Sequence, residues 1–210
     1  MGHREEEIEN TIRNEVFEKC FGLGDFKKGK DILYKYYLQY YGRLDNFETD
    51  RLILYNLIFS ECMNKNRDEE LVCKWVIQLK NDMDRQPNYK ENCTGKYCDM
   101  LSYYCDMDSI NISKEERLKY YNISYNYYKN LYDNCNSIDT YIRMINIEFS
   151  INKIQKNFLN ILEIIRDIHK IKDKKATATL KQMLYSIEDM DKQLYNKALK
   201  VIEITSKYCI

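Results

Sequence analysis

The sequence has few of the residues that build tight turns: among 210 residues there are six glycines and one proline, Pro87. Antiparallel sandwiches and barrels need many such turns, and a phosphate-binding loop needs several glycines close together. The scarcity of both residues therefore argues against these folds and against a nucleotide-binding loop.

The sequence also has no excess of charge of either sign, because 33 Lys and Arg residues balance 33 Asp and Glu residues. A chain without a positive field does not concentrate polyanions, so we expect no nucleic-acid partner. No run of 18 uncharged apolar residues occurs, so we expect no membrane span. The charged N-terminus, MGHREEE, predicts no cleavable signal peptide.

Residues for catalysis are scarce as well. A nucleophile needs a neighbouring base, and the two histidines, His3 and His169, lie in a charged terminus and on a charged helix. Cys93 and Cys98 have the loosest spacing of a zinc pair, but no second pair is so close. We therefore predict no catalytic residues, no metal site, no cofactor and no enzymatic activity.

Apolar residues recur every three or four positions through most of the chain, which predicts an all-α fold. One expected helix, at about 48–64, has Tyr55 and Phe59 on its apolar face, and Ser113 and Glu116 form a capping box. The other helices before residue 136 are expected at about 5–21, 26–41, after Asp68 up to Pro87, 98–107 and 113–133.

The last third of the chain has the longest apolar stripes, from Ile138 to Ile168 and from Leu180 to Tyr208. They predict two long antiparallel helices, each of roughly 30 residues, that reverse direction between Lys170 and Thr179. We expect a Cys- and Tyr-rich helical region at 1–135 and this hairpin at 136–210, packed together as a single domain.

The sequence contains eight cysteines, which is many for a reduced protein of this length. Their even number and the crowding of three of them near Pro87 predict a disulfide-linked bundle in an oxidising compartment. The alternative is that most are small buried residues of a reduced protein. The disulfide candidates are Cys20, Cys62, Cys73, Cys93, Cys98, Cys105, Cys135 and Cys209.

Tyrosine is abundant, with 20 residues against seven Phe and one Trp. Five tyrosines within eight helical positions cannot all face one core, so some are expected at a recognition surface. A bias toward AT-rich codons would produce the same surplus without selection for binding. The interaction candidates are Tyr34, Tyr36, Tyr37, Tyr40, Tyr41, Tyr120, Tyr121, Tyr127 and Tyr128.

The segment from Lys170 to Lys175 is the one local basic cluster. A solvated turn between helices is the default interpretation of such a cluster. A binding site for an anionic glycan is the alternative.

Two short segments resemble the Plasmodium interspersed repeat (PIR/VIR-like) variant surface proteins of malaria parasites. Residues 73–79 (CKWVIQL) resemble the cysteine-then-tryptophan helix of that family, and residues 128–135 (YKNLYDNC) resemble its Leu-Tyr-Asp-x-Cys stretch. The resemblance implies a helical, non-enzymatic protein that is exported or displayed on a cell surface and takes part in adhesion or antigenic variation. It also implies disulfides among the cysteines.

From these observations we expect an interaction domain that binds a host protein or glycan. The alternative is an intracellular, cytoplasmic adaptor that holds a partner helix in a groove, as Bcl-2 mimics do.

Overall fold

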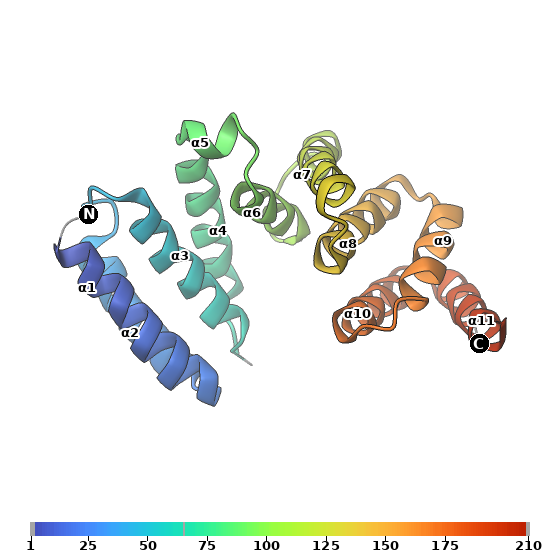
Figure 1. The fold of residues 1–210 in the computed structure, drawn as a ribbon, viewed down its shortest axis with the longest axis horizontal. Coiled ribbons are helices and arrows are strands. Elements are labelled where there is room, and N and C mark those ends of the chain that lie inside the picture. Colours follow the sequence, from blue (N-terminus) through green and yellow to red (C-terminus); the bar gives the residue numbers. More distant parts are fainter. Residues whose placement is uncertain (1–2, 65, 209–210) are drawn as a thin grey trace. The chain divides into compact units, whose positions relative to one another are not determined.

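The computed structural model describes residues 3–64 and 66–208. In this part of the chain it is 83% helical, with 11 α-helices and no strands, which confirms the all-α prediction (Figure 1). No helix in the described residues combines the length and apolar character that a membrane crossing needs.

The helices form two compact units. The first unit comprises the chain up to Pro87 together with Met107–Ile110, and the second comprises Asn88–Asp106 and the chain from Asn111 onward. This division differs from the expected one at residue 136.

The first unit begins with a helix that changes its winding. The α-helix α1 (His3–Thr11) continues as a π-helix, η1 (Ile12–Cys20), and ends in a 3₁₀ turn, η2 (Phe21–Leu23). Its buried apolar residues are spaced strictly by four: Ile8, Ile12, Val16 and Cys20 are each at most 1% exposed. An α-helical turn holds fewer than four residues and a π turn holds more, so the change of winding keeps this row on one face.

Three further helices complete the first unit: α2 (Phe26–Tyr40), α3 (Phe47–Cys62) and α4 (Glu69–Asp84). Each starts at a side-chain cap, because Asp25, Asn46 and Asp68 accept hydrogen bonds from the backbone of the first turn. Helix α3 contacts α1, α2 and α4. It is therefore the central helix of this unit.

The second unit includes most of a single turn of helix, α5 (Pro87–Lys90), and continues with α6 (Gly95–Asp106) and α7 (Lys114–Cys135). The capping prediction for α7 is confirmed, because Ser113 Oγ accepts the N–H of Glu116 at 3.0 Å. Ser124 Oγ donates to the carbonyl of Cys98 at 3.0 Å and ties α7 to α6.

The prediction of two long C-terminal helices is wrong, because each stripe is divided between two helices. The first stripe forms α8 (Ile138–Gln155) and α9 (Phe158–His169), and the second forms α10 (Lys174–Met190) and α11 (Lys192–Tyr208). Lys156 adopts the left-handed conformation, with a φ of 58°, and ends α8. Asp191 ends α10 and then caps α11, accepting the N–H groups of Gln193 and Leu194.

These four helices contact their neighbours in the chain and also the helices two positions away: α10 contacts α8, and α11 contacts α9. Lys153 donates to Ser186 at 2.9 Å between α8 and α10, and His169 is hydrogen-bonded to Ser206 at 2.9 Å between α9 and α11. The breaks therefore let four shorter helices share one core in place of one long hairpin.

The prediction of disulfide linkage is not supported, because no two of the seven described cysteines lie within disulfide distance. Cys98 and Cys105, for example, are both buried on α6, two helical turns or roughly 10 Å apart along the axis. The described cysteines lie on η1, α3, α4, α6 and α7, apart from Cys93, which lies in the turn before α6. Four of them are buried: Cys20, Cys73, Cys98 and Cys105. Two are half-buried, Cys62 and Cys93, and Cys135 is exposed. Cys209 lies outside the described residues.

Candidate functional site

The tyrosines of α2 form two rows along the helix. In the first row the ring centroids of Tyr34 and Tyr37 are 6.0 Å apart, and those of Tyr37 and Tyr41 are 5.0 Å apart. Tyr34 and Tyr37 each lie 6.2 Å from the ring of Trp75 on α4, a side chain only 1% exposed. This row therefore covers the buried tryptophan.

Hydrogen bonds attach the same row to α4. Tyr37 donates its hydroxyl to Gln78 Oε1 at 2.9 Å, and Tyr41 donates to Asp82 Oδ2 at 2.6 Å. Burial and the bond to Asp82 raise the pKa of Tyr41. These tyrosines thus contribute first to the packing of the unit.

The second row consists of Tyr36 and Tyr40, whose ring centroids are 6.1 Å apart. The guanidinium of Arg4 on α1 lies 5.5 Å from the centre of the Tyr40 ring, a cation–π distance. Of the five predicted residues on or next to α2, Tyr34 is the most exposed at 41%, while the other four are half-buried.

The tyrosines of α7 are more enclosed. Tyr121 and Tyr128 are each 3% exposed and donate their hydroxyls to Asp106 and Asp99 on α6. Burial raises the pKa of both phenols. Both were expected at a recognition surface, and the structure places them in the core of the second unit.

Arg143 of α8 completes the group around Tyr128. Its Nη1 lies 2.5 Å from both carboxylate oxygens of Asp99 and 3.0 Å from Tyr128 Oη. All of these polar groups have partners, so the cluster is a clamp between α6, α7 and α8. Tyr120, which bonds to Glu116 at 2.9 Å, and Tyr127, whose ring lies 5.1 Å from that of Tyr128, are half-buried beside it.

Phenylalanines form a surface on the first unit that the sequence did not reveal. The ring centroid of Phe21 lies 5.7 Å from that of Phe17, 5.4 Å from that of Phe26 and 5.5 Å from that of Phe59. Phe17 and Phe59 are each 40% exposed, and Tyr55, one turn before Phe59, is 46% exposed. We call Phe17, Phe21, Phe26, Phe59 and Tyr55 the phenylalanine surface.

This surface corrects the predicted orientation of α3. The apolar spacing placed Tyr55 and Phe59 in the core with Ile58, but only Ile58 is buried, at 3% exposed. A helix as apolar as α3 has no single hydrophobic face in its sequence, so the pattern could not show which side neighbouring helices cover. The signal that could have found the surface is the cluster of three phenylalanines at positions 17, 21 and 26.

A small pocket of ≈ 190 Å³ lies where α2 ends and α3 begins. Tyr41, Gly42 and Phe47 line it from that side, and Asp82, Arg85 and Gln86 line it from the end of α4. Asp50 of α3 is its most buried charged residue, at 7% exposed. We call this pocket the Asp50 pocket.

The Asp50 carboxylate is only half satisfied. Its Oδ2 accepts the N–H of Gly42 at 3.0 Å, whereas its buried Oδ1 has no hydrogen bond to any described residue. Burial, followed by the negative charges of Asp82 and Glu5, raises the pKa of Asp50 to about 6, and the bond from Gly42 opposes this shift. A carboxyl group in this state requires a hydrogen-bond donor or a proton.

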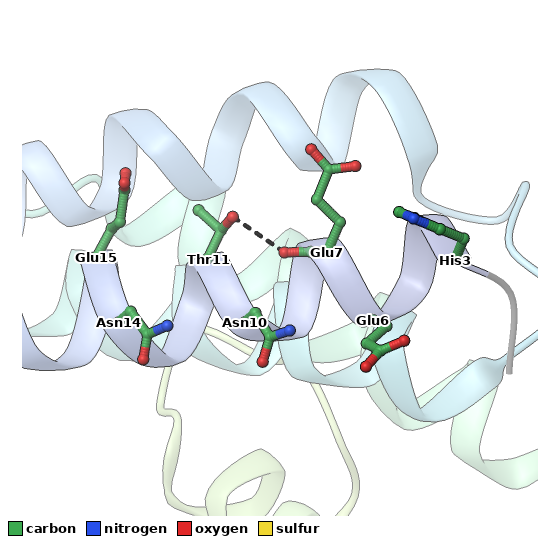
Figure 2. Close-up of a pocket in the computed structure, with 7 residues that line it drawn as sticks. All are labelled: His3, Glu6, Glu7, Asn10, Thr11, Asn14 and Glu15. Carbon is green, nitrogen blue, oxygen red and sulfur yellow. Dashed lines mark hydrogen bonds between the residues drawn. The ribbon is translucent and has the colours of Figure 1, made fainter.

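A larger hollow follows one face of the first helix, from His3 to Glu15 (Figure 2). Its side chains project in different directions, and the one hydrogen bond drawn joins Thr11 Oγ1 to the carbonyl of Glu7 at 3.0 Å. Because no polar groups converge there, we do not assign a site to this face.

The basic segment is partly neutralised. Lys170 lies 3.3 Å from Asp167, and Lys175 lies 2.7 Å from Asp139 of α8. Two of its four lysines therefore already face carboxylates, which weakens the glycan alternative.

The described residues contain no group of three or more His, Cys, Asp or Glu that could hold a metal ion. Burial raises the pKa of the Cys98 thiol to about 12, so this cysteine is unreactive at neutral pH.

No protein-family model, curated protein or solved structure matches this chain.

Proposed function

We propose that this protein is a non-enzymatic binding module that recognises a partner protein through the phenylalanine surface. The observation that carries the proposal is the exposure of Phe17 and Phe59, which the ring of Phe21 joins into one aromatic group. Tyr55 is exposed one turn before Phe59 on the same helix. Scattered apolar side chains are normal on a protein surface, but a connected aromatic patch is typical of an interface.

The surface extends beyond its five defining residues. Met63, one turn after Phe59, is 50% exposed, and Leu23, two residues after Phe21, is 81% exposed. Aromatic rings and methionine give a large contact area at low entropic cost, and they are enriched where binding energy concentrates. A partner that inserts apolar side chains between these residues fits this chemistry better than a sulfated glycan does.

From the resemblance to parasite surface antigens, we further propose that the partner is a host protein. The chain would reach this partner after export or display on a cell surface. An intracellular adaptor that binds a partner helix is the second candidate. It is favoured by the burial of Cys20, Cys98 and Cys105, which are each at most 1% exposed and serve as small core residues.

The test measures saturable binding of the purified, fluorescently labelled protein to host cells. We expect the double variant Phe17→Ser/Tyr55→Ser to bind at least tenfold more weakly, because both side chains are exposed members of the surface. The matched control is Leu159→Ser/Tyr185→Ser, which removes two side chains of 76% and 69% exposure from the second unit. Circular dichroism shows whether each variant keeps its helices.

Treatment of the cells distinguishes the partners. Binding that is lost after protease treatment and kept after glycosidase treatment supports a host protein. Three results would contradict the proposal. The first is binding that is lost after glycosidase treatment and kept after protease treatment. The others are an equal loss of binding in both double variants and the absence of saturable binding.

A further inference from the structure

We propose that the Asp50 pocket is a binding site for a protonated primary amine, with Asp50 as the carboxylate that receives its hydrogen bonds. This inference goes beyond the proposed function and does not depend on it, because the pocket and the phenylalanine surface share no residue. It rests on four features of the pocket.

The first feature is the unsatisfied oxygen. Asp50 lines the pocket, and its Oδ1 is buried and has no hydrogen bond to any described residue. Buried polar atoms in native proteins are almost always paired, since an unpaired one carries the full cost of its desolvation. A ligand that donates an N–H would remove this cost.

The second feature is the sign of the charge. Asp82 is a second carboxylate of the pocket wall, and Asp82 and Glu5 both act on Asp50 through their negative charges. Arg85 lies 3.5 Å from Asp82 Oδ1, with its side chain 78% exposed at the rim. Asp82 already accepts a hydrogen bond from the Tyr41 hydroxyl and pairs with the Arg85 guanidinium. Asp50 is hydrogen-bonded to neither of these two groups. The pocket thus selects a cation and directs it to Asp50.

The third feature is the size and the lining. Two aromatic residues, Tyr41 and Phe47, are among those that line a space of ≈ 190 Å³, which is below the range of drug-sized pockets. Aromatic walls suit the alkyl stem of an amine and interact favourably with its ammonium group. A short alkylammonium, or the end of a lysine side chain, has this size and this chemistry.

The fourth feature is the number of oxygen atoms that could coordinate a bound cation. A calcium ion takes six to eight oxygens, and Mg²⁺ requires near-octahedral coordination. The two carboxylates of the pocket have too few oxygens to fill a calcium shell, and one oxygen of each already accepts a hydrogen bond. One ammonium group needs three acceptors at most.

The binding should depend on pH in a defined direction. The groups that face Asp50 are Asp82 and Arg85 from the end of α4, Glu5 from α1 and Tyr41 from the end of α2. Because the pKa of Asp50 is about 6, a proton competes with the amine below that pH. Amine affinity should therefore rise between pH 5 and pH 7 and then level off.

The experiment is calorimetric titration of the whole chain with n-butylammonium chloride at pH 7.5. A second arm uses N-acetyl-lysine methylamide, which distinguishes a free amine from the lysine of a partner protein, and n-butanol is the uncharged control. We expect saturable one-to-one binding of at least one ammonium probe and none of n-butanol.

The matched variants are Asp50→Asn and Asp45→Asn, the latter an exposed aspartate five residues earlier that does not line the pocket. We expect Asp50→Asn to weaken amine binding at least tenfold and to abolish its rise with pH, and Asp45→Asn to change neither. If neither probe binds the wild type, or if Asp50→Asn binds like the wild type, the proposal fails. Failure here would leave the phenylalanine surface untouched, since that test uses other residues.

Discussion

The two units use the same abundant residue in opposite ways. In the first unit the tyrosines of α2 lie along the outside of the helix, stack on one another and cover Trp75. In the second unit Tyr121 and Tyr128 are buried, and their hydroxyls bond to aspartates of α6. A surplus of tyrosine therefore does not identify a surface. Tyr41 and Tyr121 both donate to an aspartate, but the first is half-buried and the second is buried.

The carboxylates show the same contrast. Asp99 in the second unit receives hydrogen bonds from Tyr128 and Arg143, whereas one oxygen of Asp50 in the first unit has no partner among the described residues. A satisfied polar network specifies a rigid core, and an unsatisfied buried group is costly unless a ligand completes it. The fully paired cluster around Asp99 is therefore structural, whereas the unpaired oxygen of Asp50 supports the binding role that we propose for it.

The largest effect is expected from Gly29→Ala, which tests how rigid the aromatic packing of the first unit is. A Cβ at Gly29 would lie 3.0 Å from Phe21 Cδ1 and closer still to Cε1. The Phe21 ring is held among Phe17, Phe26 and Phe59, so it cannot easily move aside. We expect a net loss of about 2 kcal/mol in urea unfolding, because the clash outweighs the gain in helix propensity.

The control for this variant is Gly22→Ala, where the nearest atom to the added Cβ is the carbonyl oxygen of Phe17 at 3.4 Å, an ordinary contact. Equal stability of the two variants would show that the phenylalanine packing is loose.

A pair of aspartate variants should change stability in opposite directions. Asp50→Asn can keep the bond to the Gly42 N–H and removes a half-satisfied charge, so we expect about 1 kcal/mol of stabilisation at pH 7.5. Asp99→Asn removes the charge that faces Arg143, so we expect a loss of about 1 kcal/mol, reduced by the partial exposure of this pair.

The raised pKa of Asp50 also predicts how the stability difference between the wild type and Asp50→Asn changes with pH. Its pKa is about 6 in the folded protein and ordinary in the unfolded chain, so the folded state holds the extra proton between roughly pH 4 and 6. As the pH rises through this interval, the stability of the wild type should fall relative to that of Asp50→Asn, and below about pH 4 the difference should stop changing with pH. Urea unfolding at several pH values measures it, and a difference that is constant with pH would be inconsistent with a raised pKa.

The smallest effect is expected at the break between α8 and α9. Lys156 holds a φ of 58°, a conformation that costs a side chain with a Cβ about 1 kcal/mol. Lys156→Gly should therefore stabilise the protein by about 0.5–1 kcal/mol in thermal or urea unfolding. The neighbouring Gln155→Gly, at the last residue of α8 and outside the left-handed region, should bring no such gain. A loss of stability in both variants would indicate that the break is maintained by other contacts.

Much of the fold could be predicted from spacing alone. The scarcity of Gly and Pro and the three-to-four spacing predicted an all-α protein, and Ser113 marked the start of α7. The breaks at Lys156 and Asp191 were missed because the apolar stripes continue in register across them, and neither residue is a glycine or a proline. Asn157 and Asp191 were available as capping signals, but a polar residue on the outer face of a long helix has the same appearance.

Sequence by itself determined that this chain forms amphipathic helices, since helix formation depends on local spacing, caps and propensity. Which faces of those helices meet was decided only by the tertiary structure. It left Phe17, Phe59 and Tyr55 exposed, buried Tyr121 and Tyr128, kept the described cysteines beyond disulfide distance and enclosed Asp50 without a second partner. The physical reason is that burial and pairing depend on residues far apart in the chain, and no spacing within one helix encodes the identity of the helix packed against it.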